Sequence, residues 1–156
     1  MAALSDFYEN KLIDFLFRAQ ALGVTGASAA AGTGPATLYI GLYTINPTDA
    51  AGGTEVTGGS YARVTVTSSL ANWAGTQAAA STTASSGTGG TTSNNGAITY
   101  PAPTANWGVV TGFAAFDAAS AGNMLIWTAL TTNKTVNNGD PAPSFAAGAF
   151  TFQIDN

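Results

Sequence analysis

The chain of 156 residues contains no cysteine and no histidine. Without cysteine it can form no disulfides, no thiolate nucleophile and none of the usual structural zinc sites. Without histidine it lacks the general base on which most serine and cysteine nucleophiles depend. These two absences exclude the common forms of nucleophilic catalysis.

Charged residues are also scarce, at 8% of the chain, whereas an average soluble domain has about 25%. Alanine, glycine, serine, threonine and asparagine take their place, so charge repulsion between copies is weak. A nucleic-acid partner is not expected, because binding a phosphate backbone needs clustered basic residues. The four that are present are scattered along the chain: Lys11, Arg18, Arg63 and Lys134. This composition favours a protein that packs against other proteins.

The N-terminus has the features of neither an export signal nor a membrane anchor. A membrane span needs about 20 consecutive, predominantly apolar residues. Charged side chains interrupt this stretch at Asp6, Glu9, Lys11, Asp14 and Arg18. There is no basic start followed by an apolar run and a small-residue cleavage site. We expect a soluble chain, synthesised in a cytoplasm, with no membrane partner.

Residues 6–21 have the pattern of an amphipathic helix. Asp6 is the expected N-cap and Gly23 the expected C-terminal stop. Asp14 and Arg18 have the spacing of an ion pair on one helix face. Apolar side chains cover most of the circumference: Phe7, Tyr8, Leu12, Ile13, Phe15, Leu16, Phe17 and Ala19. Either one domain covers the helix on all sides, or part of the helix docks on a neighbouring subunit.

The remainder of the chain shows the alternation of β-strands separated by turn signals. Strands are expected at residues 37–44, 61–67, 97–100, 107–116, 124–130, 134–136 and 149–154, with a hairpin loop at residues 119–123. This pattern predicts an all-β fold, an antiparallel β-sandwich or barrel of jelly-roll-like form, with one N-terminal α-helix.

The expected organisation has three parts. Residues 1–22 form the helix, residues 23–36 a flexible linker of small residues, and residues 37–156 the β-sandwich domain. Residues 74–95, the polar tract, form a loop of alanine, glycine, serine, threonine, glutamine and asparagine only. A segment without large apolar residues cannot offset its ordering entropy alone. The tract is therefore either mobile or ordered by lying on another part of a protein.

No catalytic, cofactor-binding or metal-binding residues are expected. Asp49 and Glu55 flank a glycine-rich loop and could share a calcium ion, but their spacing matches no known calcium loop. For Asp117 and Asp140, capping of turns is the favoured role. The glycine-rich stretches lack the lysine and the strand-to-helix setting of phosphate-binding loops.

The aromatic residues suit a core or an interface. Trp107 and Trp127 lie on expected strands and are interpreted as core, whereas Trp73 could also be a platform for a sugar. Tyr39 and Tyr43 project from one face of a strand, which suits either an interface or a second core layer.

The stretch GGTEVTGGSYARV, residues 52–64, combines two glycine pairs with a single acidic residue. The glycines are expected to let a long loop turn twice before a strand that starts at Tyr61. Arg63 is expected either to contact another subunit or a partner protein, or to be solvated on a sheet face.

Three motifs occur in a fixed order along the chain. They are the helix LSDFYENKLIDFLFR, then PATLYIGLYT with PTDAAGGTEVTGGSYAR, then AITYPAPTANWGVVTGFAAFDAASAGNML with KTVNNGD. In this order they resemble a family of small structural proteins of tailed bacteriophages, labelled variously as tail-fibre or head-decoration proteins. The resemblance covers nearly the whole chain except the polar tract.

The resemblance implies a virion protein without enzymatic activity or cofactors. We expect a capsid cement protein that binds the outer head surface as a homotrimer and holds major capsid subunits together. The alternatives are a tail-fibre or tail-tip component and, as a third class, a carbohydrate-binding attachment module. The chain lacks the long repeats of many fibre shafts, which favours the head. The expected interface residues are Phe7, Leu12, Phe15, Leu16, Phe17, Tyr39, Tyr43, Tyr61 and Arg63.

Overall fold

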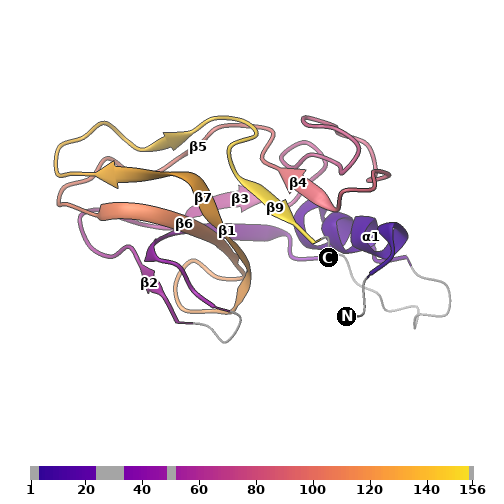
Figure 1. Cartoon of the computed structure of the whole chain (residues 1–156), viewed down its shortest axis with the longest axis horizontal. Helices are drawn as coiled ribbons and strands as arrows, with labels where there is room; N and C mark the ends of the chain where they lie inside the picture. The colour runs from indigo at the N-terminus through magenta and orange to yellow at the C-terminus, as the bar shows by residue number, and fades with distance from the viewer. Residues whose placement is uncertain (1–3, 24–33, 49–51, 155–156) are drawn as a thin grey trace. The chain divides into compact units, whose positions relative to one another are not determined.

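The computed structural model describes residues 4–23, 34–48 and 52–154. This part of the chain contains one helix and nine strands (Figure 1). The pairs β1–β2, β1–β6, β4–β9, β5–β8 and β6–β7 are antiparallel. The elements are α1 (Asp6–Arg18), β1 (Thr37–Ile45), β2 (Thr54–Glu55), β3 (Val64–Thr67), β4 (Thr91–Ser93), β5 (Ile98–Thr99), β6 (Gly108–Phe116), β7 (Met124–Val136), β8 (Ser144–Phe145) and β9 (Thr151–Gln153). The expected all-β fold with one N-terminal helix is confirmed.

Contacts within the chain define two compact units. Unit 1 consists of Met1–Thr37, Thr67–Ala97 and Ala146–Asn156, and unit 2 of Leu38–Val66 and Ile98–Phe145. Unit 1 contains α1 together with β4 and β9, which lie close to the helix in Figure 1. The continuous boundaries expected from the sequence remain a prediction, and most of the expected linker lies outside the described residues.

Unit 2 is built on a five-stranded sheet in the order β2-β1-β6-β7, with β3 also paired to β1. The alternation expected in β1 is confirmed, because Leu38, Ile40 and Leu42 are fully buried on one face of the sheet. Ile40 lies opposite Ala115 of β6, which places the centre of β1 beside the centre of β6. The hydrophobic strand pattern therefore fixes the register of this sheet.

A second layer in unit 2 surrounds Tyr100, which follows the small β5–β8 ladder. The Tyr100 hydroxyl donates a hydrogen bond to the Ile40 carbonyl of the main sheet, at 3.0 Å. Its ring stacks on Tyr61, and Trp107 and Phe145 contact it edge-on. Trp107 is buried, as expected for a core residue, and its indole N–H donates to a backbone carbonyl.

The core of unit 1 forms where α1 packs against the segment that contains Trp73 and against β9. Phe17 of α1 contacts Trp73 at a ring-centroid distance of 4.9 Å and Phe152 of β9 at 5.0 Å. All three rings are fully buried, together with Ile13. Trp73 is therefore a core residue, and its ring is not available as a platform for a sugar.

The ends of α1 differ from the sequence prediction. Ser5, not Asp6, occupies the N-cap position, where its carbonyl oxygen accepts hydrogen bonds from the first helical turn. The helix ends at Arg18 because Ala19 adopts a left-handed conformation, with φ of 54°, well before Gly23. The expected helix was therefore three residues too long at this end. A polar residue at the right position predicts a cap, but two neighbouring candidates cannot be separated by pattern alone.

Several strand boundaries also differ, and the largest differences are at β3 and β7. β3 begins at Val64, and β7 runs as one strand through the residues expected to form two separate ones. An irregularity in the β6–β7 pairing lets β7 continue past the polar residues that suggested a break. The hairpin between β6 and β7 is confirmed, with Asp117 accepting hydrogen bonds from both the backbone and the side chain of Asn123.

Candidate interaction surfaces

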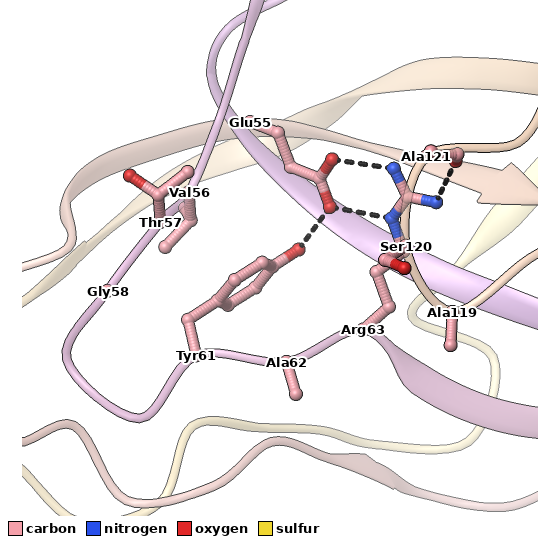
Figure 2. Close-up of a pocket in the computed structure, with 10 residues that line it drawn as sticks. All are labelled: Glu55, Val56, Thr57, Gly58, Tyr61, Ala62, Arg63, Ala119, Ser120 and Ala121. Carbon is pink, nitrogen blue, oxygen red and sulfur yellow. Dashed lines mark hydrogen bonds and ion pairs between the residues drawn. The ribbon is translucent and has the colours of Figure 1, made fainter.

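Glu55 and Arg63 form a bidentate ion pair in unit 2 (Figure 2). The Arg63 Nε donates to Glu55 Oε1 and its Nη2 donates to Oε2, both at 2.8 Å. Parallel pairing of this kind is among the stronger side-chain interactions in proteins, because two charged hydrogen bonds share one fixed geometry. The glycine-rich loop therefore folds back so that its single acidic residue meets the arginine eight positions later.

The same guanidinium also binds the hairpin between β6 and β7. Arg63 Nη1 donates to the backbone carbonyls of Ala118 and Ala121, each at 2.8 Å. The guanidinium carbon lies 3.3 Å from the centroid of the Phe116 ring. Arg63 thus stacks on one aromatic face and ties two loops together, and its side chain is only 7% exposed. Its expected role at an interface remains a prediction.

Tyr61 completes this network on the side of β1. Its phenolic oxygen accepts a hydrogen bond from the Leu42 amide at 2.8 Å, and its hydroxyl donates to Glu55 Oε1 at 3.0 Å. Burial raises the pKa of the Tyr61 phenol well above its ordinary value, and the negative charge of Glu55 adds to the rise. Tyr61 therefore acts as a neutral donor that helps to hold the carboxylate.

Gly41 in the middle of β1 provides the space for the Glu55 carboxylate. A Cβ atom at Gly41 would lie 2.7 Å from Glu55 Oε1 and 3.0 Å from a ring carbon of Phe116. Glycine normally weakens a strand interior, and here it permits the close approach of the carboxylate to the backbone.

An open hollow of about 370 Å³ lies beside the Glu55–Arg63 pair (Figure 2). It is lined by Glu55, Val56, Thr57, Gly58, Tyr61, Ala62, Arg63 and residues 119–121. Both charged side chains in it are already paired with each other, so the hollow offers no free charge to a ligand. The calcium site considered from the sequence would also require Asp49, which lies outside the described residues.

Unit 1 also contains a network built on an ion pair, formed by Asp14 and Arg18 of α1. Their side chains make the expected ion pair, with Arg18 Nη1 2.6 Å from Asp14 Oδ1. Asp14 also accepts hydrogen bonds from the backbone amide and the hydroxyl of Ser85. Arg18 donates to the carbonyls of Trp73, Ser81 and Thr83. The ion pair therefore binds both the core segment and the polar tract.

Asn10 extends this contact by one helical turn. Its amide nitrogen donates to the Gly87 carbonyl at 2.9 Å, and its amide oxygen accepts a hydrogen bond from the Thr76 hydroxyl. Asn10, Asp14 and Arg18 recur at four-residue spacing, which places them on one helix face. The polar tract is thus ordered by lying on this polar face of α1, which is one of the two outcomes left open by its composition.

A second hollow, the β4–β9 hollow, belongs to unit 1 and has a volume of about 290 Å³. Its lining contains no charged residue: Ala74, Gly75, Thr76, Ala78, Ala79, Thr91, Thr92, Ser93, Gly148 and Thr151. Methyl groups, hydroxyls and backbone make up its wall. Sequence reasoning missed this hollow, because its residues come from three segments whose proximity depends on the β4–β9 pairing.

The expected interface residues have different environments. Phe17 and Tyr43 are buried, and Tyr43 stacks on Phe116 in unit 2. Tyr39 packs against the edge of that cluster and remains half-buried, as does Trp127. Half-buried helix residues are Leu12, Phe15 and Leu16. Phe7 is the most exposed of the set, at 58%. Whether any of these residues contacts a partner stays a prediction.

Within the described residues, no group of three acidic side chains is placed to hold a metal ion. Likewise, the helix found in this part of the chain is too short and too polar to cross a bilayer. Among the described residues, two arginines are paired within their own units, and the two hollows described above contain no unpaired charged side chain. These features define a class of β-rich proteins whose units are held together by buried ion pairs as well as by hydrophobic cores.

The chain belongs to the family described as podophage GP4 fiber I protein gp80, whose model matches residues 3–153. This match confirms the resemblance to small structural proteins of tailed phages. No curated protein matches the chain.

Proposed function

We propose that this protein is a non-catalytic structural subunit of a fibre on a tailed-phage virion. The observation that carries the proposal is the family match, which extends over nearly the whole chain and describes a fibre protein. The fold supports it, because each unit contains its own internal network of hydrogen bonds built on an ion pair. The protein acts by packing against neighbouring virion proteins.

The distribution of charge supports a packing role. Arg18 and Arg63 are each paired inside their own unit, which leaves Lys11 and Lys134 as the remaining basic side chains of the chain. A surface with so few charges presents a small desolvation cost when it is buried against another protein. Many such contacts, each weak alone, hold an assembly together through avidity.

The head-cement role expected from the sequence has less support than the fibre role. It rested on the absence of shaft-like repeats, whereas the family description names a fibre. A fibre also has parts other than a repetitive shaft, so the absence of repeats does not oppose a fibre role. Binding to the major capsid protein and a homotrimeric state remain predictions of the cement role.

Copy number in purified virions tests the proposal. Quantitative mass spectrometry would measure this chain relative to the major capsid protein in intact particles. We expect a few dozen copies or fewer per particle, as a set of fibres requires. Hundreds of copies would support the cement role instead, and absence from the particles would contradict both.

A further inference from the structure

β7 is the end strand of the five-stranded sheet in unit 2, and no described strand pairs with its outer edge. An unpaired edge presents backbone N–H and C=O groups to which a strand of another molecule can bond. Residues 124–130 of this strand contain no proline, glycine or charged side chain, and each is half-buried or exposed. Short, uncharged segments of high β-propensity aggregate through such open edges. Copies of the chain would therefore pair along β7 unless the structure prevents it.

The pairing of β7 with β6 is interrupted in the middle of the strand. Val110 of β6 pairs with Lys134, and Gly112 pairs with Ala129. Four residues of β7, residues 130–133, therefore lie opposite the single β6 residue between these two pairs. We name these four residues the β7 bulge, and three of them are exposed. A bulge bends its strand and disrupts the ladder locally.

A second irregularity lies near the start of β7. Ala115 pairs with Ile126 and Phe116 pairs with Met124, so the intervening residue of β7 has no residue opposite it. Between the two irregularities, only residues 126–129 continue the regular ladder. Such a short regular edge offers few hydrogen bonds to an added strand, because only alternate residues direct their backbone groups outward.

The β6 residue opposite the β7 bulge, Thr111, is held in place by a neighbouring segment. Its hydroxyl donates a hydrogen bond at 2.9 Å to Oδ1 of Asn46, which directly follows β1. The next residue, Gly112, leaves room for this side chain, because a Cβ there would collide with Asn46 Oδ1. Glycine inside a strand often marks a bulge or the close approach of another group. The irregular pairing therefore has specific contacts that support it.

We infer that the β7 bulge prevents the outer edge of this sheet from pairing with a strand of another molecule. Natural sheets protect their edges by bulges and by very short edge strands. The opposite side of β1 carries only such short strands, β2 of two residues and β3 of four. This inference goes beyond the proposed function, because it states how the protein meets its neighbours. They contact side chains and loops of unit 2 and do not add strands to its sheet.

Deletion of residues 131–133 tests the inference on the full-length protein. It leaves Leu130 opposite Thr111, which restores one-to-one pairing without shifting the register of either half of β7. This variant is expected to self-associate through its β7 edge. Each added backbone hydrogen bond strengthens association roughly twofold to tenfold, so several together should raise the association constant about a hundredfold over the wild type. Sedimentation velocity over a concentration series measures it.

The matched control is deletion of residues 131–132. It removes two of the same exposed residues but leaves two residues of β7 opposite Thr111, so a bulge remains. This control is expected to associate no more than the wild type does. It separates removal of the bulge from the mere shortening of the strand.

A charge on the edge identifies the surface through which copies associate. Ala129 is exposed and belongs to the regular stretch of β7. Combined with deletion of residues 131–133, Ala129→Lys is expected to return association to the wild-type level, because lysine on an edge opposes strand pairing. In the otherwise unchanged chain, Ala129→Lys is expected to leave association unaltered.

Circular dichroism checks that each variant is folded. If deletion of residues 131–133 prevents folding, deletion of residues 130–132 replaces it and leaves Asn133 opposite Thr111. A folded deletion variant that associates no more than the wild type would overturn the inference. So would a wild-type protein whose self-association is weakened by Ala129→Lys, a result that decides the matter even if neither deletion folds. Both results would leave the fibre role standing, because copy number in virions is measured independently of this edge.

Discussion

Asp14 and Arg18 lie one turn apart on α1, and both bind Ser85, which is 71 residues further along the chain than Asp14. The side chain of Arg18 is fully buried, and that of Asp14 is 5% exposed. A tract without large apolar residues is therefore held in place by a buried ion pair rather than by hydrophobic contacts. Replacing both partners of a buried pair by apolar residues is often neutral, but removing one partner is costly, because it leaves an uncompensated buried charge.

Replacement of Arg18 by methionine is expected to destabilise unit 1. It leaves the Asp14 carboxylate buried without its counter-charge and removes the donors to the Ser81 and Thr83 carbonyls. The free energy of unfolding should fall by about 3–5 kcal/mol. Denaturant unfolding measures the loss, and hydrogen exchange should show amides of residues 76–87 exchanging faster than in the wild type.

The control for this variant is Lys11→Met, which also replaces a basic residue of α1 by methionine, at a half-buried position. It should change the free energy of unfolding by less than about 0.5 kcal/mol. If Arg18→Met lowers the free energy of unfolding no more than Lys11→Met does, the ion pair does not hold the polar tract in place.

Arg63→Lys is expected to destabilise unit 2 although it conserves the charge. Lysine cannot form the two parallel bonds to Glu55 while also donating to the Ala118 and Ala121 carbonyls. The expected loss in denaturant unfolding is about 2–3 kcal/mol, since charged hydrogen bonds in a nearly buried site are broken. Arg63→Lys with wild-type stability would show that a single positive charge is sufficient there.

Gly41→Ala tests the space beside the Glu55 carboxylate. The added methyl would lie within 3.0 Å of both Glu55 and Phe116, so the ion pair must shift. We expect a loss of about 1–3 kcal/mol, as for overpacking of a core. Gly89→Ala is the control, because a Cβ at Gly89 meets no atom within 4 Å. Equal stability of the two variants would contradict a tight fit at Gly41.

Alkaline titration tests the buried tyrosines. Burial raises the pKa of Tyr61 and Tyr100, and burial together with the Glu55 charge raises that of Tyr43. A phenol that keeps its proton in the folded state stabilises the fold fully below the unfolded pKa of about 10, and this contribution falls as the pH rises above it. Stability should therefore decline above about pH 10 on their account.

Ultraviolet absorbance follows this ionisation directly. Three of the chain's five tyrosines carry these raised pKa values and should ionise at higher pH than ordinary tyrosine, and Tyr61 and Tyr100, the more deeply buried, should ionise last. The same chain in denaturant should titrate as ordinary tyrosine. Complete titration of all five in the folded protein with a midpoint near pH 10 would show that the phenols are accessible.

The sheet of unit 2 was largely predictable from the sequence. Alternation in β1 indicated the buried set of Leu38, Ile40 and Leu42, because a strand repeats every two residues. The hairpin after Phe116 followed from its turn residues. The partner of Glu55 was not predicted, since the loop between Glu55 and Arg63 can close in several ways and Arg63 suited an exposed role equally well.

The buried face of α1 was less predictable. Hydrophobicity marked most of the circumference as apolar, yet the fully buried apolar residues of α1 are Ile13 and Phe17. Neighbouring positions on this helix bury a charged pair instead, because carbonyl acceptors for Arg18 come from a segment distant in sequence. The pattern of residues within a helix cannot predict acceptors so distant in sequence. Only the four-residue spacing of Asp14 and Arg18 indicated that this face of α1 carries an ion pair.

The position of the protein on the virion tests the account most directly. Electron microscopy of intact particles labelled with an antibody fragment against this chain would show where it lies. The fibre role predicts label on fibres attached to the tail region and bare heads. Label distributed over the head surface would contradict it.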